Sequence, residues 1–154
     1  MKLYNRINGE ELKKQLLESD EERITLSFYK YYHLPNPQIF RDHIYYRWNQ
    51  VGVLGRIYVA TEGINGQISV PADNIDAFKK EFSDITFLDG IRMNFAIEDD
   101  GKSFFKLKIK IRPKIVADGL NDETFDVTDK GTHIDAKQFN ELTQSPDTLS
   151  LIHI

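Results

Sequence analysis

The sequence contains no cysteine in its 154 residues. Disulfide bonds, a thiolate nucleophile and cysteine-bound metals are therefore excluded from this chain. No stretch approaches the roughly 18 consecutive apolar residues that a membrane-spanning helix needs. The first residues, MKLYNRINGEELKK, also lack the apolar segment of a secretory signal. We expect a cytoplasmic protein that does not associate with a membrane, although a lack of cysteine fixes no compartment by itself.

The usual catalytic and cofactor motifs are missing as well. The sequence has no Walker loop, no GxGxxG and no GxSxG. Its four histidines do not have the spacing of metal ligands: His33, His43, His133 and His153. No flavin, iron or zinc site is visible. The sequence therefore points to no cofactor or metal site.

The balance of charge is slightly acidic. The chain has 24 acidic and 20 basic residues, for a net charge of -4. It is not a polycation, so a role in nucleic-acid binding would have to depend on a local basic patch. The apolar fraction of 40% and the charged fraction of 29% are ordinary for a globular protein.

Apolar periodicity predicts an alternation of helices and strands. Spacings of three and four predict helices over residues 8–19, 37–50, 74–82 and 135–143. Alternation and short apolar runs predict strands over residues 24–30, 53–60, 66–71, 91–97 and 103–112. Three of these helices have candidate N-caps: Asn8 for the first helix, either Asp73 or Asn74 for the third, and Thr132 for the last.

This order of elements is typical of an α+β, ferredoxin-like (acylphosphatase-like) split βαβ sandwich with an extra strand and short flanking helices. We expect this domain to span residues 1–117, followed by a connector and helix over 118–148. Acylphosphatase activity needs an arginine-bearing phosphate cradle after the first strand. The loop at that position, KYYHLPNP, has no arginine and no glycine, so we exclude that activity.

The last predicted strand carries a basic stripe. Four cations share one parity in KLKIKIR: Lys106, Lys108, Lys110 and Arg112. Leu107, Ile109 and Ile111 take the other parity and are expected in the core. Same-face side chains on a strand are roughly 6.6 Å apart, which is close to the phosphate spacing of an extended nucleic acid. The alternative is a solvated edge strand that lysines protect from aggregation.

Two further stretches contain candidate site residues. In FYKYYH, Tyr29 and Lys30 combine an aromatic ring with a cation, a pair that can bind RNA bases; the alternative is that the tyrosine packs under the first helix. In ATEGINGQIS, the two glycines around Asn65 permit an irregular loop that projects Glu62 and Asn65 from the sheet. The alternative is a plain hairpin turn.

Several long stretches resemble one known family. These are ITLSFYKYYH, GRIYVATEGINGQISVP, DDGKSFFKLKIKIR and KIVADG. Together they resemble the N-terminal region of the bacterial rhodanese-related tRNA uridine hydroxylases (the TrhO/YceA type), over about residues 2–148. The resemblance implies an acylphosphatase-like domain followed by a rhodanese domain. It also implies oxygen-dependent hydroxylation of the wobble uridine in the tRNA anticodon to 5-hydroxyuridine, with molecular oxygen as co-substrate.

The chain departs from this pattern after SPDTL. The family continues there into the first rhodanese strand and, far downstream, to a reactive cysteine; this sequence instead ends in LSLIHI. The catalytic cysteine therefore has no counterpart in this chain. LSLIHI matches the translation of a common transposon-end adapter, so we expect residues 149–154 to be a non-native tail.

The resemblance gives the candidate residues provisional roles. We expect the basic stripe to bind phosphates, and Tyr29 and Lys30 to contact RNA near the anticodon loop. Arg56, Glu62 and Asn65 are expected to position the base or to shape the cleft between this domain and the rhodanese domain. Two alternatives stay open: part of a rhodanese-type sulfurtransferase, and a scaffold domain without a catalytic role.

Overall fold

The computed structural model describes residues 7–116, 119 and 126–150 of the chain. Within these ranges the elements alternate as the sequence predicts. In chain order they are α1 (Gly9–Glu18), β1 (Arg23–Tyr31), α2 (Pro37–Gln50), β2 (Leu54–Ala60), β3 (Gly63–Pro71), the 3-10 helix η1 (Ala72–Asn74), α3 (Ile75–Ser83), β4 (Asn94–Phe95), β5 (Leu107–Ile111) and α4 (Ala136–Thr143). None of the described helices is long and apolar enough to cross a membrane.

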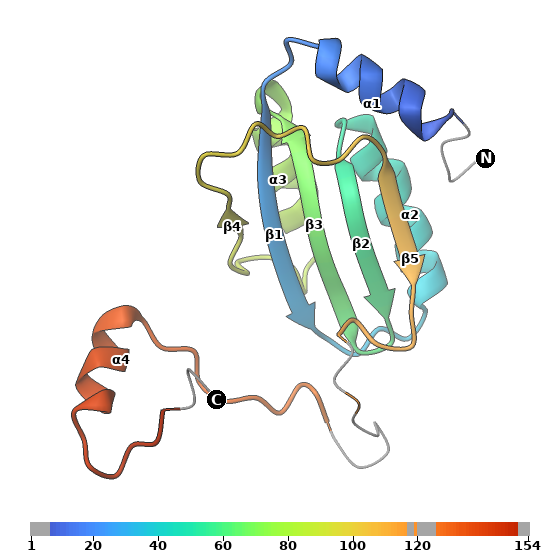
Figure 1. Cartoon of the computed structure of the whole chain (residues 1–154). Helices are drawn as coiled ribbons and strands as arrows, with labels where there is room; N and C mark the ends of the chain where they lie inside the picture. Colours follow the sequence, from blue (N-terminus) through green and yellow to red (C-terminus); the bar gives the residue numbers. More distant parts are fainter. Residues whose placement is uncertain (1–6, 117–118, 120–125, 151–154) are drawn as a thin grey trace.

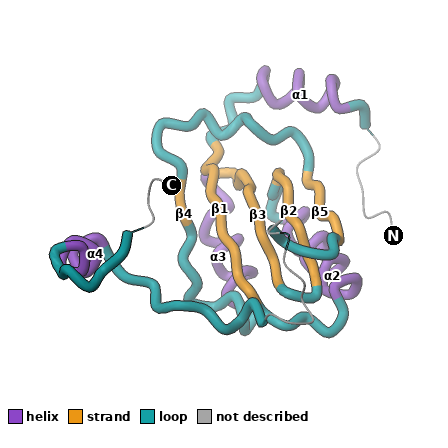
Figure 2. Tube along the Cα trace, turned by 60° about the horizontal axis from the view of Figure 1, so that its bottom comes forward, coloured by secondary structure: helices purple, strands orange, loops and turns teal. Residues whose placement is uncertain are grey.

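The strands form a single mixed sheet in the order β4-β1-β3-β2-β5 (Figures 1 and 2). β3 is antiparallel to both β1 and β2, while β5 runs parallel to β2 at one edge. The first four strands and the helices α2 and α3 thus make the split βαβ plan, and β5 is the extra strand. The α+β, ferredoxin-like prediction is confirmed.

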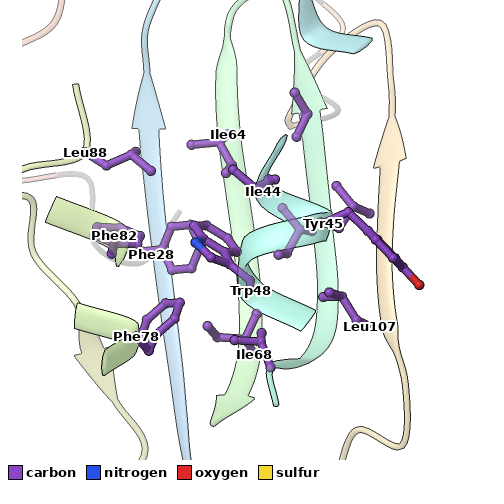
Figure 3. Packing of buried hydrophobic residues seen from close by; sticks show 14 of the residues in the cluster. Phe28, Ile44, Tyr45, Trp48, Ile64, Ile68, Phe78, Phe82, Leu88 and Leu107 are labelled. Carbon is purple, nitrogen blue, oxygen red and sulfur yellow. The ribbon is translucent and has the colours of Figure 1, made fainter. Parts of the chain in front are cut away.

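Helices α2 and α3 cover one face of the sheet and enclose the core (Figure 3). Ile44 and Trp48 of α2 and Phe78 and Phe82 of α3 are fully buried, as their helical spacing predicts. Phe28 of β1 sits between the two helices. Its ring lies edge-on to Trp48, with the centroids 5.9 Å apart, and to Phe82, at 4.9 Å.

The hairpin between β2 and β3 is tighter than the sequence predicts. The expected strand over 66–71 in fact begins at Gly63, and the turn contains only Thr61 and Glu62. The prediction was wrong because Ile64 continues the inward series of β3 and is fully buried. Main-chain pairing therefore extends to Ala60 and Gly63.

Close packing, rather than an irregular loop, requires glycine at the two glycine positions of this hairpin. A Cβ atom on Gly66 would lie 2.5 Å from Cζ of Phe28, so the Phe28 ring occupies the space that a side chain would need. Gly63 has φ 143°, and a Cβ atom there would lie 2.1 Å from the carbonyl oxygen of Lys30. Only glycine fits both positions without a shift of the neighbouring strand.

Two predicted strands are much shorter than expected. The strand over 91–97 reduces to Asn94–Phe95, because only Ile91 and Met93 pack against the core and Ile97 is 89% exposed. The strand over 103–112 reduces to Leu107–Ile111. Leu107 and Ile109 are buried as predicted, whereas Ile111 is exposed at the end of the sheet.

Helix caps were predicted unevenly. Asn8 caps α1, where its side chain accepts a hydrogen bond from the N–H of Glu10. The last helix is capped by Asp135 rather than Thr132, because Asp135 and Gln138 form a reciprocal capping box. Asn74 precedes α3, but its side chain donates to the carbonyl of Val51 instead. In α1 only Leu16 is buried, and Leu17 is exposed.

Candidate RNA interface on the open face of the sheet

The face of the sheet opposite α2 and α3 is not covered by any described helix (Figure 1). Alternation places every second residue of each strand on this open face. The strand register then aligns these residues in transverse rows. The first row is Tyr29–Asn65–Tyr58–Lys110, and the second is Ser27–Gln67–Arg56–Lys108.

The open face of the strands is free of carboxylates. Its polar and aromatic side chains in the described strands are Arg23, Thr25, Ser27, Tyr29, Tyr31, Arg56, Tyr58, Asn65, Gln67, Ser69, Asn94, Lys108 and Lys110. Four of these are cations and none is acidic, although the chain as a whole carries a net charge of -4; Arg23 is buried and paired with Glu21, and the other three cations are exposed. The accessible part of the sheet therefore carries a local excess of positive charge.

The predicted basic stripe lies along the β5 edge of this face. Lys108, Lys110 and Arg112 are exposed, and Lys106 is partly exposed just before the strand begins. The guanidinium of Arg112 lies 5.7 Å from the centroid of the Tyr58 ring, close enough for a cation–π contact. Arg56 is exposed and lies opposite Lys108 in register. The structure therefore adds Arg56 to the stripe.

Tyr29 and Lys30 do not share a face. Tyr29 lies on the open face and is 49% exposed, with its ring edge-on to that of Tyr31 at 6.3 Å. Lys30 pairs with buried Ile64 and is on the helix side of the sheet. Both residues reach one hollow of about 330 Å³ at the end of β1, which is also lined by Arg92. The prediction that they contact RNA together stays a prediction.

Glu62 and Asn65 hold the chain that leaves the sheet. The Glu62 side chain is buried, and its Oε1 accepts a hydrogen bond of 2.6 Å from the N–H of Ile115. Nδ2 of Asn65 donates to the carbonyl oxygen of Ile115 at 3.3 Å. After β5 the chain therefore turns back across the end of the open face (Figure 1). Their role in positioning a base stays a prediction.

A second segment crosses the open face at its other end, between β4 and β5 (Figure 2). It is anchored at Lys102, whose Nζ donates to the carbonyls of Leu17 and Ser19. Ser103 and Phe104 line a hollow of about 350 Å³ beside Ser27, and another of about 140 Å³ beside Arg56. The accessible part of the face lies between the two crossing segments.

Sequence reasoning missed Tyr58 and Gln67 as members of this face. The signal for Tyr58 was present, because it lies two residues after Arg56 in an alternating strand. Its alignment with Lys110 depends on the parallel pairing of β2 and β5, which joins residues far apart in the sequence. Periodicity within single strands contains no such information.

Ionisable groups with shifted pKa values lie away from the open face. Hydrogen bonds from Arg47 hold the pKa of Glu81 below its ordinary value, where the carboxylate of α3 meets α2 at 2.5 and 2.6 Å. Hydrogen bonds from Arg41 and Gln38 lower the pKa of Asp42. Among the described residues, no three histidines or carboxylates come close enough to hold a metal ion.

Comparison with known proteins agrees with this architecture. A family model described as the UPF0176 acylphosphatase-like domain matches residues 23–115. Proteins named tRNA uridine(34) hydroxylase are similar over 148 residues, or 96% of this chain. The sequence identity is 52% for the protein of Pectobacterium carotovorum, 50% for that of Hamiltonella defensa and 46% for that of Photorhabdus laumondii.

The chain spans 42% of the length of these relatives. The matched region runs from β1 to Ile115 and so contains the whole sheet, the two covering helices and the Glu62–Ile115 contact. The relatives that match nearly all of this chain are named tRNA uridine(34) hydroxylase. The chain belongs to the family of proteins with a UPF0176 acylphosphatase-like domain.

Proposed function

We propose that this chain is the RNA-holding N-terminal part of an enzyme that hydroxylates the wobble uridine of tRNA to 5-hydroxyuridine, with molecular oxygen as co-substrate. The names of the relatives support the substrate and the reaction. The chain has no cysteine, so the reactive cysteine of this chemistry would belong to a rhodanese domain. A tRNA substrate implies a cytoplasmic location.

The observation that carries this proposal is the separation of charge on the sheet. The strands of the open face hold exposed Arg56, Lys108 and Lys110 and no carboxylate. Lys106 and Arg112 continue the basic stripe beyond the two ends of β5. Phosphate contacts from such a row supply affinity that does not depend on sequence and that falls with salt. The row would hold the RNA near the anticodon while the rhodanese domain acts on the base.

Within this proposal, Glu62 and Asn65 determine the shape of the site by holding the segment that follows β5. By fixing the main chain of Ile115 they set where the polypeptide leaves the sheet. They would therefore shape the cleft between this domain and the next one, as the sequence suggested. Arg56, at the centre of the second row, is the residue best placed to contact a phosphate beside the target base.

The test is binding of tRNA to this chain across a salt series. Replacement of Lys106, Lys108, Lys110 and Arg112 by alanine is expected to weaken binding and to reduce the slope of log K against log salt by about 3, since each lost phosphate contact removes roughly 0.7 to 0.9. The matched control replaces four exposed lysines outside the open face, Lys14, Lys79, Lys80 and Lys137. It removes the same charge and should keep most of the slope.

Two results would contradict the proposal. Equal loss of affinity in both quadruple variants would mean that total charge, not the open face, attracts RNA. Unchanged binding after charge reversal at Lys108 and Lys110 would favour a scaffold domain. A third result, persulfide on the cysteine of the full-length protein without formation of 5-hydroxyuridine, would favour a sulfurtransferase.

A further inference from the structure

We propose that the open face binds unpaired RNA, with one base stacked on Tyr29 and another on Tyr58 while the phosphates follow the neighbouring row of Gln67, Arg56 and Lys108. This inference rests on the proposed function and deepens it, because it specifies single-stranded RNA with splayed bases as the ligand. The argument depends on the two rings, on their spacing and on the polar row beside them.

Tyr29 offers an accessible and braced ring. It is 49% exposed on the open face, whereas Leu26 and Phe28 of the same strand are buried on the other face. Tyr31, two residues along the same strand, meets it edge-on at an interplanar angle of 75°. This contact limits the rotation of Tyr29, so less side-chain entropy is lost when a base stacks on it.

Tyr58 combines a ring with two cations. It is partly exposed, Lys110 lies opposite it in register, and the guanidinium of Arg112 lies 5.7 Å from its ring centroid. A base on Tyr58 would therefore have cations beside it for the flanking phosphates. Aromatic stacking next to lysine and arginine is the usual composition of single-strand sites, and it is tolerant of base identity.

The spacing of the two rings decides between paired and unpaired RNA. Tyr29 and Tyr58 lie in one row with Asn65 between them, so their backbones are about 10 Å apart at the usual strand spacing. Successive bases in a helix are only about 3.4 Å apart. The Asn65 side chain, between the two tyrosines in the row, already donates to the carbonyl oxygen of Ile115. Bases on the two tyrosines therefore cannot remain stacked on each other.

The second row supplies a path for the backbone. Gln67, Arg56 and Lys108 are exposed and lie on three adjacent strands, roughly 6.6 Å from the row of tyrosines. A nucleotide placed on this row can direct its base toward a ring and its phosphate toward a cation. Duplex RNA keeps its base faces stacked inside the helix, so no base face is free to stack on the tyrosine rings.

The probes are a fluorescent oligouridine of ten nucleotides and an RNA duplex with the same number of phosphates per strand, both titrated with the whole chain at fixed salt. We expect tighter binding of the oligouridine. Tyr29→Ala and Tyr58→Ala should each weaken its binding by about fivefold or more, as expected from the loss of one base–aromatic stack. Tyr29→Phe and Tyr58→Phe should bind like the parent, because they keep the ring.

Three controls keep the outcomes distinct. Tyr46→Ala removes an exposed ring from α2, outside the open face, and should leave binding unchanged. The salt slope of the tyrosine variants should equal that of the parent, because no cation is lost. Unfolding curves identify any alanine variant whose fold is damaged. For such a position the phenylalanine variant provides the test instead. Weakened binding by folded Tyr29→Phe and Tyr58→Phe, which keep the rings, would overturn the role of the rings.

Equal affinity for duplex and oligouridine would overturn the inference, as would normal binding by folded tyrosine-to-alanine variants. In either case the phosphate row, and with it the proposed function, would still be supported if the Lys106/Lys108/Lys110/Arg112 variant lost its salt slope. If the parent bound neither RNA, the proposed function of this face and the inference would both fail.

Discussion

The main-chain N–H of Ile115 donates a hydrogen bond of 2.6 Å to Oε1 of Glu62, a residue 53 positions earlier in the chain. Glu62 is only 6% exposed, and its other carboxylate oxygen is buried without a hydrogen-bond partner. A buried carboxylate beside a hairpin turn thus holds the segment that leaves the domain. Hydrogen bonds that involve a charged group are among the stronger ones in proteins.

Glu62→Ala is expected to lower the free energy of unfolding by about 1–3 kcal/mol, because the buried N–H of Ile115 loses its acceptor. Glu62→Gln keeps an acceptor at Oε1 and should cost less. Urea denaturation measures both, and amide exchange at Ile115 reports the local contact. Glu18→Ala removes an exposed carboxylate of α1 and serves as the control, with a change within about 0.5 kcal/mol. An unprotected Ile115 amide in the parent would contradict the contact itself.

Alanine substitution of the hairpin glycines separates packing from loop flexibility. Gly66→Ala should lower the free energy of unfolding by about 1–3 kcal/mol, because its Cβ would overlap the Phe28 ring. Gly63→Ala should be at least as costly, because the clash is with the carbonyl of Lys30, which cannot rotate away. Gly131 has open space around it and provides the control, where alanine should be nearly neutral. Thermal melts that rank Gly131→Ala with the others would refute this account.

The Arg47–Glu81 pair predicts a specific pH dependence of stability. Its hydrogen bonds lower the pKa of Glu81 in the folded state. The stabilisation is therefore present above the unfolded pKa, near 4.3, and is lost as the pH falls through the folded value. The difference in unfolding free energy between the parent and Glu81→Gln should be largest at neutral pH and shrink toward pH 3. A difference that stays constant over this range would show that the pair has no role in acid sensitivity; Glu141→Gln, on exposed α4, is the comparison.

Arg56→Ala tests the centre of the second row. We expect weaker binding of tRNA and a decrease of about 0.7–0.9 in the salt slope, which corresponds to one phosphate contact. Lys80→Ala removes one charge from α3, on the covered side of the sheet, and should change neither quantity by a comparable amount. An Arg56→Ala protein whose slope equals that of the parent would exclude a phosphate contact at this residue.

Periodicity was sufficient for the order of the elements and for most of the core. The helical spacing that predicts α2 and α3 also identifies their apolar side, and Ile44, Trp48, Phe78 and Phe82 on that side are fully buried. Periodicity failed at the β2–β3 hairpin, where an apolar residue stands between two glycines. Ile64 looked like part of a glycine loop, yet its burial in β3 extends the strand to Gly63.

The candidate site was less accessible to sequence reasoning. The parity of Lys108 and Lys110 was read correctly within one strand. Tyr29 and Lys30 were grouped because they are neighbours in sequence, although adjacent strand residues point to opposite faces. The contacts of Glu62 and Asn65 with Ile115 join residues about fifty positions apart. No local pattern records such a closure, which exists only once the chain has folded.

The carboxylate-free face also has a kinetic consequence. The strands of the open face carry three exposed cations and no carboxylate, while the chain as a whole has a net charge of -4, so positive charge is locally in excess on this face. A polyanion that approaches this face is attracted by the local charge before any contact forms, so approach from the open side of the sheet is favoured. Salt shortens the range of this selection, from about 30 Å at 0.01 M to about 8 Å at 0.15 M. The sheet thus orients encounters in solution as well as holding what arrives.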